Sequence, residues 1–353
     1  MDKFSDFDAI EPEVYPAKRN ETYSPRIAWY GDCILVGSHA GLRLYDPDQA
    51  SSGVQLATIN SRSISNIAVD LENEIIAFNV AQEPAIHFIH SNSDTSVWQV
   101  EEDAITDISF SPTGDYIAVS SADIGIDPPY SYDPNLQILD SELDVISTMS
   151  TDASAGVFVG STFTVNEGNI LVYVLRQGYI GNEIELWDIN SASKLWDNTT
   201  LLQNMDKRSL NDPLAIERVA TNGQIIALGG MDGYNFNEYY GTAIHIWDIE
   251  SMNRISEIII HRRNAGEDEN RLVGLDLSSD GSKLAITQLN GQISLWDPIK
   301  GTIVAEYQPG TQNVPGLSFS PDNEKLALLY EDEIRILDST ELNQITTISL
   351  SDR

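Results

Sequence analysis

The chain has 353 residues, with 54 Asp and Glu against 20 Lys and Arg, which gives a formal net charge of −34. Nucleic acids and anionic lipid surfaces are bound by neutralising their phosphates with cationic side chains, so this charge argues against a DNA, RNA or membrane partner. No apolar run is long enough to span a bilayer. The acidic N-terminus lacks the basic start and apolar centre of a secretory signal, so we expect a cytoplasmic protein.

The acidity itself admits two interpretations. A chain with so few cationic residues is typical of organisms that hold molar salt inside their cells, because salt screens the repulsion between carboxylates that keep the surface hydrated. The alternative is an ordinary solvated acidic surface. The single cysteine, Cys33, lies in an apolar run, and we expect a buried, unreactive thiol there.

In chain order, residues 1–25 form an acidic segment that we expect to be flexible or packed on the domain that follows. Seven pairs of short runs then alternate apolar and polar residues, the period of two that predicts antiparallel strands. The predicted hairpins are Ile27–Ser38, Ile67–Phe78, Ile108–Ser120, Val157–Leu175, Glu217–Leu228, Gly274–Thr287 and Gly316–Tyr330.

A third run follows each hairpin and ends in a recurring triplet. A fourth run follows each triplet, the last being Gln344–Leu350, so each set of four strands is expected to be contiguous in the chain. The triplets recur at intervals of 41 to 60 residues: Leu44-Tyr45-Asp46, the degenerate Phe88-Ile89-His90, Ile138-Leu139-Asp140, Leu186-Trp187-Asp188, Ile246-Trp247-Asp248, Leu295-Trp296-Asp297 and Ile336-Leu337-Asp338.

The clearest copy of this unit resembles the WD40 repeat. It places the turn Ser-Ser-Asp-Gly at Ser278–Gly281 before Leu295-Trp296-Asp297, and Ser111–Gly114 and Ser320–Asn323 are similar turns. The resemblance implies an all-β fold, a seven-bladed β-propeller of four-stranded antiparallel blades filling residues 26–353 as one monomeric domain. The tryptophans of the triplets, Trp187, Trp247 and Trp296, are expected to pack between blades.

Four connections are long: 121–135, 198–215, 230–243 and 261–271. Each joins a second strand to a third, or a fourth strand to the next blade, and in a propeller such connections emerge on one face. The connections of the other face are short. Because insertions gather where a repeat protein binds its partners, this face is the predicted interaction surface.

Aromatic residues concentrate in two of these connections. Tyrosine combines a large apolar area with a polar tip and little rotamer entropy, which suits binding, although such rings can also pack on one another and hold a long loop in place. Arg262 and Arg263 form a predicted polar rim; alternatively they neutralise the acidic run Glu267-Asp268-Glu269. The predicted aromatic anchors are Tyr130, Tyr132, Tyr234, Phe236, Tyr239 and Tyr240.

The sequence carries no catalytic signature. Its five histidines are scattered without a metal-ligand spacing, there is no cysteine pair, and no glycine-rich phosphate loop follows a strand. We therefore expect no catalytic residue, no metal and no cofactor, and a non-catalytic platform that binds partner proteins. The alternative is an enzyme or small-ligand-binding propeller, with a site at the top of the axial channel that includes His39 or His261.

Overall fold

The computed structural model describes residues 26–48, 53–58, 63–81, 83–92, 94–100, 104–122, 134–150, 157–166, 169–177, 182–197, 215–232, 241–249, 251, 253–262, 272–310, 314 and 316–350. These residues belong to two compact units. The first unit contains Met1–Ile180, Ile184–Trp196 and Leu350–Arg353, and the second contains Gly181–Glu183 and Asp197–Ser349. None of the described residues forms a helix long and apolar enough to cross a membrane.

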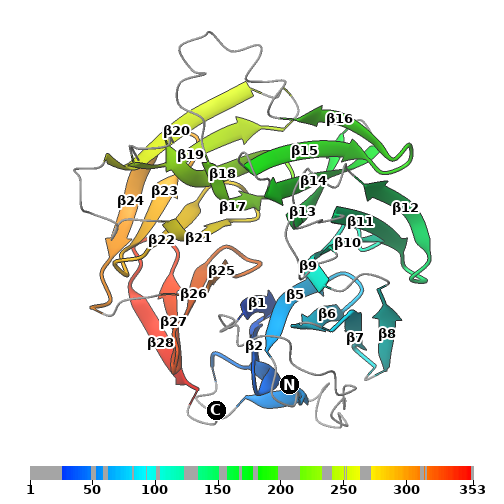
Figure 1. Ribbon diagram of the computed structural model, residues 1–353. Helices are drawn as coiled ribbons and strands as arrows, with labels where there is room; N and C mark the ends of the chain where they lie inside the picture. Colours follow the sequence, from blue (N-terminus) through cyan, green and yellow to red (C-terminus); the bar gives the residue numbers. More distant parts are fainter. Residues whose placement is uncertain are drawn as a thin grey trace, which may run out of the picture. The chain divides into compact units, whose positions relative to one another are not determined.

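The described strands form seven four-stranded antiparallel sheets (Figure 1), each made of four consecutive strands, which confirms the prediction of contiguous blades. The first unit holds four sheets, although a few residues of β15 and β16 belong to the second unit. Their strands are β1 (Arg26–Tyr30), β2 (Cys33–Ser38), β3 (Gly41–Tyr45), β4 (Val54–Ala57); β5 (Ile64–Asp70), β6 (Ile75–Val80), β7 (Ala85–His90), β8 (Thr95–Gln99); β9 (Ala104–Phe110), β10 (Tyr116–Ala122), β11 (Pro134–Asp140), β12 (Val145–Ser150); and β13 (Val157–Asn166), β14 (Asn169–Gln177), β15 (Asn182–Asp188), β16 (Ser193–Asp197).

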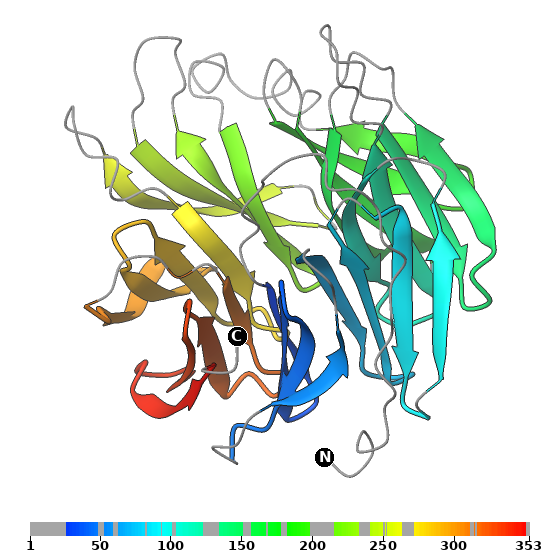
Figure 2. The same cartoon turned by 60° about the horizontal axis from the view of Figure 1, so that its bottom comes forward.

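The second unit holds the remaining three sheets, and we number the blades one to seven in chain order. Its strands are β17 (Ala215–Thr221), β18 (Ile225–Asp232), β19 (Gly241–Asp248), β20 (Asn253–Arg262); β21 (Leu272–Leu277), β22 (Leu284–Gln288), β23 (Ile293–Asp297), β24 (Thr302–Tyr307); and β25 (Gly316–Phe319), β26 (Lys325–Leu329), β27 (Glu333–Asp338), β28 (Gln344–Ser349). Figure 2 shows the strands of each sheet side by side from a second direction.

Burial varies across each blade from its first strand to its fourth. All five residues of β22 are buried, because a sheet covered on both faces buries both sets of alternating side chains. In β8, a fourth strand, exposed residues alternate with partly buried ones. The second strand of blade six is therefore interior and the fourth strand of blade two faces solvent, whereas β4, the fourth strand of blade one, has no exposed residue.

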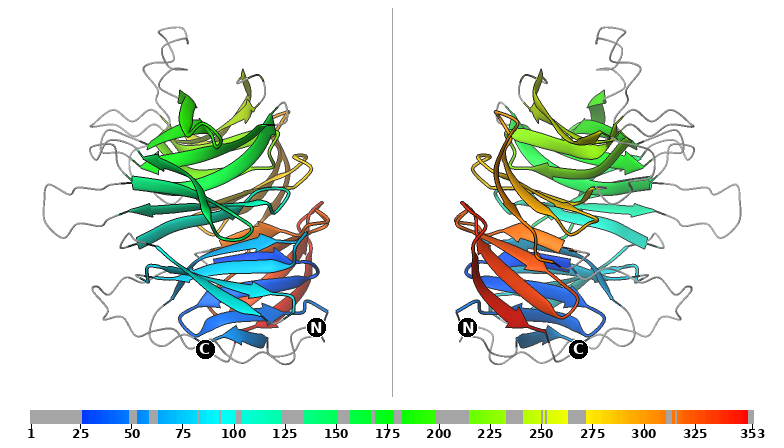
Figure 3. Two further views of the ribbon diagram at one scale, coloured as in Figure 1. Left: turned by 90° about the vertical axis from the view of Figure 1, so that its right-hand side faces the viewer. Right: turned by 90° about the vertical axis from the view of Figure 1, so that its left-hand side faces the viewer.

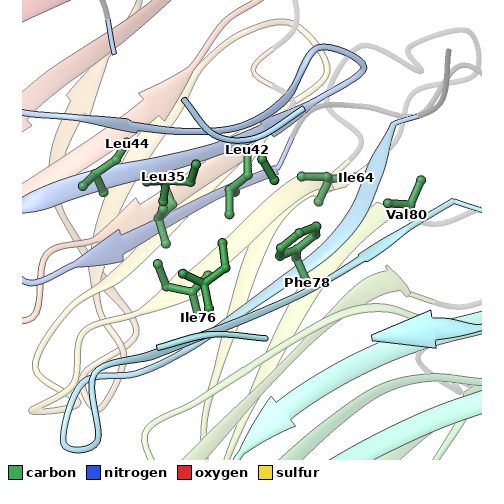
Figure 4. Packing of buried hydrophobic residues seen from close by; sticks show 10 residues of the cluster. Leu35, Leu42, Leu44, Ile64, Ile76, Phe78 and Val80 are labelled. Carbon is green, nitrogen blue, oxygen red and sulfur yellow. The ribbon is translucent and has the colours of Figure 1, made fainter. Parts of the chain in front are cut away.

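Apolar layers join neighbouring blades of the first unit, whose inner strands β1, β5, β9 and β13 lie next to one another in that order. Figure 4 shows the layer between blades one and two, where Leu35 and Leu42 face Ile76 and Phe78. A second layer contains Phe88 of blade two together with blade three residues, and a third joins blades three and four. The left panel of Figure 3 shows these sheets, blue to green, stacked on one another.

The second unit repeats this construction. Ile244 and Ile246 of blade five pack with Leu284 and Ile286 of blade six, and a further layer joins blades six and seven. The inner strands β17, β21 and β25 are again neighbours.

The predicted structural side chains lie mostly as expected. Trp187 is buried in the layer between blades three and four, and Trp296 packs against the layer between blades five and six. Trp247 is partly buried. Cys33 corrects one expectation: it is half-buried beside the first layer because it begins β2. Burial still raises the pKa of its thiol, with nearby Asp46 adding to the effect, which keeps the group protonated and unreactive.

Candidate functional site

Seven of the eight predicted interaction residues lie outside the described part of the chain: Tyr130, Tyr132, Tyr234, Phe236, Tyr239, Tyr240 and Arg263. The eighth, Arg262, is the last residue of β20, and its backbone pairs with Gly241 at the start of β19. The structure therefore locates the strand ends from which the predicted surface extends.

Each blade has two edges across its strand ends. We call the edge where the second strand ends and the third begins the loop edge, and the opposite edge the turn edge. In blade five, Ala215 pairs with Met231, and Gly241 pairs with both Asp232 and Arg262. The segments 198–214, 233–240 and 263–271 are therefore all attached to the loop edge of this one blade.

Blade three anchors the fourth long segment in the same way. Ala122, the last residue of β10, pairs with Pro134, the first of β11, so segment 123–133 starts and ends at the loop edge of blade three. The observed strands extend one to three residues into each of the four long connections that the sequence predicts. The assignment of all four segments to loop edges agrees with the prediction.

At the turn edge, the aspartate that ends the triplet closes the third-to-fourth turn. Asp338 accepts hydrogen bonds from the backbone N–H groups of Thr340 (3.0 Å) and Glu341 (2.7 Å) at Oδ1 and of Asn343 (2.7 Å) at Oδ2. Burial alone would raise the pKa of Asp338, but these donors favour the charged form and lower it to about 2. The same role is played by Asp46, Asp140, Asp188, Asp248 and Asp297.

Blade two departs from this arrangement because His90 replaces the aspartate. The turn is closed instead by Asn92 Oδ1, which accepts from Asp94 N (3.0 Å), while His90 N donates to Asp94 O (2.9 Å). His90 Nε2 lies 3.4 Å from Ser96 Oγ. A polar hollow of about 410 Å³ opens at this turn, lined by Asn73, His90, Ser91, Asn92, Asp94, Thr95 and Ser96.

The first-to-second turns interlock between neighbouring blades. In the second unit, Asn222 Nδ2 donates to Ser279 O (3.3 Å), and Ser279 N donates to Asn323 Oδ1 (2.8 Å), so the turns of blades five, six and seven are bonded in sequence. In the first unit, the side chains of Asp70 and Asn73 of blade two lie against Gly114 of blade three. These polar groups of the turn edges are engaged within the protein.

Polar side chains also connect neighbouring inner strands. Arg26 Nε donates to Ser65 O (2.7 Å) and Arg218 Nε to Val273 O (2.8 Å), in each case on the next blade. Two carboxylates are linked similarly. Asp107 accepts from Ser161 N (2.6 Å) and Oγ (2.9 Å), and Asp276 accepts from Phe319 N (2.7 Å).

The surroundings of these two carboxylates are unfavourable to charge. Removal from water raises the pKa of Asp107 and of Asp276 to about 6, although the hydrogen bonds that each accepts act in the opposite direction. Sequence reasoning missed both residues because a carboxylate is uninformative in so acidic a chain. The available signal was their place within an inner strand whose nearest apolar residues are buried or partly buried: Ile105 and Ile108 around Asp107, and Leu275 and Leu277 around Asp276.

The described histidines do not converge. His87 is buried, stacks on Phe78 and lies 3.0 Å from Glu83 through Nε2, whereas His39 is exposed at a loop edge. Burial lowers the pKa of His245, and Arg254 adds to this effect while Glu257 opposes it. Within the described ranges, no three His, Cys, Asp or Glu side chains are grouped closely enough to hold a metal ion.

Four-stranded antiparallel sheets, stacked through apolar layers with their inner strands adjacent, define the blades of a β-propeller arrangement. Residues 93–123 match the model of the WD domain, G-beta repeat. The chain therefore carries a WD40 repeat, confirming the resemblance seen in the sequence. The matched residues run from β8 through β10, the outer strand of one blade and the first hairpin of the next. A search of curated protein sequences finds no match to this chain.

Proposed function

We propose that this protein is a non-catalytic interaction platform that binds partner proteins at the loop edges of its blades. WD40 propellers are typically scaffolds for protein interactions, and a chain with a net charge of −34 is a poor ligand for nucleic acid or anionic lipid. The observation that carries the proposal is the attachment of three long segments to the loop edge of blade five.

The two edges of the blades are used differently, which supports this choice of surface. At the turn edges, short connections are closed by their own Asp, Asn and Ser side chains, and the interlocking turns consume further donors and acceptors. A partner that bound these engaged groups would have to replace bonds that stabilise the fold. The loop edges of blades three and five instead carry the chain's longest insertions, the segments a platform can vary without disturbing its core.

The proposed contacts are Tyr130, Tyr132, Tyr234, Phe236, Tyr239 and Tyr240 as apolar anchors, with Arg262 and Arg263 at the rim. Aromatic and arginine side chains are the residues most often found at the energetic centre of protein interfaces. The site requires neither a metal nor a cofactor in this proposal.

The proposal also includes one closed, monomeric ring of seven blades in the cytoplasm of a salt-accumulating cell. It rests on the seven contiguous four-stranded sheets and on the acidic composition. A compact domain of 353 residues has a radius of gyration of roughly 20 Å. Small-angle scattering that gives two separated bodies instead would contradict the ring.

The test of function compares the partner proteins bound by three forms of the chain in lysate of the source organism at its intracellular salt. The forms are the native chain, a variant with Tyr234, Phe236, Tyr239 and Tyr240 changed to Ser, and a control with the exposed Leu195 and Ile299 changed to Ser. All three must melt alike. We expect a partner that the native and control forms retain and the aromatic variant loses, because removal of central aromatic anchors typically costs 2 kcal/mol or more, roughly thirtyfold in affinity.

Equal retention by all three forms would show that the loop edge of blade five is not the binding surface. The variant with Tyr130 and Tyr132 changed to Ser then tests blade three separately. Failure of every form to retain a protein, combined with binding of a metabolite to the native chain, would instead support the enzyme or small-ligand alternative.

A further inference from the structure

Blade two differs from the other blades at its outer edge. Where the structure describes the pairing of third and fourth strands, a β-bulge interrupts it in blades one, three, five, six and seven. In blades three, six and seven the extra residue is a solvent-exposed Ile146, Val304 or Ile345, between 46% and 54% exposed. Bulges of this kind disturb an edge strand and prevent another chain from pairing with it.

The fourth strand of blade two, β8, pairs with β7 without interruption, from Ala85 with Gln99 to Ile89 with Thr95. Two hydrogen bonds show which residue pairs of this ladder are hydrogen-bonded: His90 N donates to Asp94 O (2.9 Å) and Val100 N donates to Pro84 O (2.8 Å). Because bonded and non-bonded pairs alternate in an antiparallel ladder, the N–H and C=O groups of Thr95, Val97 and Gln99 point away from β7. Figure 1 shows β8 at the outer edge of its sheet.

The side chains of β8 do not protect this edge either. The strand reads Thr-Ser-Val-Trp-Gln, without a charge or a proline, in a chain in which 21% of residues are charged. Thr95, Val97 and Gln99 are exposed, with Val97 46% exposed, while Trp98 packs on the apolar layer between blades two and three. Proteins usually protect edge strands with charged residues, proline, bulges or short length. The strand β8 has no charge, proline or bulge, and at five residues it is not unusually short.

The polar hollow described above lies at the start of β8 and includes Thr95 and Ser96 from the strand itself. Among its described lining residues the acidic one is Asp94, whose Oδ2 accepts a hydrogen bond from Asn92 Nδ2 (2.7 Å). A carboxylate beside an open strand edge favours a cationic side chain on whatever pairs there. The net charge of −34 favours the same kind of partner and opposes pairing with a second copy of the chain.

We propose that β8 is a docking edge for an extended segment of a basic partner protein, which adds to blade two as a fifth, antiparallel strand. The segment has an uncharged, β-branched stretch that bonds to the backbone of Thr95, Val97 and Gln99. A Lys or Arg follows at its C-terminal end, where the antiparallel direction brings it to Asp94 and the hollow. This surface is separate from the loop edges, so it does not depend on the proposed function.

The test uses a fluorescein-labelled peptide, Thr-Val-Thr-Val-Thr-Lys-Arg, with fluorescence anisotropy as the readout. Val97→Pro deletes an N–H that points away from β7, so the β7–β8 ladder is retained while strand addition is blocked. Val97→Thr is the matched control, since it changes the side chain and keeps the backbone donor. We expect saturable binding to the native chain, weakening by about tenfold or more in Val97→Pro and by less than about twofold in Val97→Thr.

The basic end of the peptide is tested separately. Asp94→Asn, and a peptide ending in Glu-Glu, should each weaken binding severalfold, an effect that decreases as salt is added. This pair of measurements keeps the proposal testable if Val97→Pro does not fold. Absence of saturable binding, or equal binding by the native chain and a folded Val97→Pro variant, would overturn the proposal. A concentration-dependent dimer in sedimentation that Val97→Pro abolishes would also overturn it, because the occupant would then be a second copy.

Discussion

The fold strongly changes the acidity of Asp107 and Asp276. Both lie on inner strands, β9 and β21, and both accept backbone hydrogen bonds from the next blade. A carboxyl group can accept such hydrogen bonds whether it is protonated or ionised. Only the neutral acid does so without the cost of a poorly solvated charge.

We predict that Asp107→Asn and Asp276→Asn stabilise the protein at neutral pH. Each native carboxyl has a pKa of about 6 against 3.8 when unfolded, so its stabilising contribution is complete below about pH 4 and is lost as pH rises through 6. Asn keeps an acceptor and carries no charge. The gain in the free energy of unfolding should be about 2 kcal/mol at pH 8 and near zero at pH 4, measured by urea unfolding at both pH values.

The control for this prediction is Asp297→Asn, at a turn whose aspartate has a lowered pKa because of hydrogen bonds from Lys300. That change should lower the free energy of unfolding at pH 8, because an amide accepts the hydrogen bonds that close the turn more weakly than the Asp297 carboxylate does. If all three substitutions shift stability in the same direction, the distinction between inner-strand and turn carboxylates is wrong.

At this scale, the structure confirms structural residues that the sequence predicts, while the binding residues stay predictions. The triplet aspartates could be located because they recur with the repeat, and the buried Trp187 follows from the same pattern. The partners of Asp107 could not be predicted, because Ser161 lies 54 residues away and meets it only when blades three and four pack. Whether the predicted aromatic anchors face a partner stays a prediction.

Turns are the elements that hold successive blades in register. Gly281 has a left-handed backbone (φ +68°), and a Cβ built on it would lie 2.6 Å from Asn222 Nδ2 of the preceding blade. Gly223 also has a positive φ (+86°), yet a Cβ there would have no neighbour within 4 Å. The two glycines therefore share the conformational requirement and differ in the contact between blades.

We predict that Gly281→Ala costs about 1 kcal/mol more stability than Gly223→Ala. Both substitutions strain a left-handed residue by about 1–2 kcal/mol, but only Gly281→Ala also displaces Asn222 and its hydrogen bond to Ser279 O. Thermal unfolding of both variants beside the native chain is the measurement. Equal losses would mean that the contact between these turns contributes nothing to stability.

Strand positions were largely predictable, and the irregularities between them were not. The predicted hairpin Gly274–Thr287 agrees with β21 and β22 because its alternation and its Ser-Ser-Asp-Gly turn point to the same structure. The bulge at Val304 depends on how β24 aligns with β23, which local sequence does not specify. The regular edge of β8 therefore became visible only in the structure.

For the whole molecule, charge is the main long-range term. Fifty-four acidic residues against 20 basic ones repel one another in the folded state, and the repulsion acts over the Debye length, which falls from about 10 Å at 0.1 M salt to about 3 Å at 1 M. The core layers of both units are apolar and do not depend on this screening.

We predict that the melting temperature rises between 0.1 and 1 M KCl by roughly 4 °C or more, corresponding to at least about 3 kcal/mol for a chain of this size. Calorimetry in KCl is the measurement, with sucrose as a control for general exclusion of solute from the surface. An unchanged melting temperature would favour an ordinary acidic surface over adaptation to molar salt.

The interlocking turns have a direction. Asn222 of blade five bonds to the turn of blade six, whose Ser279 bonds to blade seven, and all four strands of each blade are consecutive. During synthesis from the N-terminus, each blade therefore leaves the ribosome complete, without waiting for a distant strand, and can dock on the blade made just before it. The order of synthesis matches the order of these contacts, which favours assembly one blade at a time and limits the exposure of unpaired inner strands.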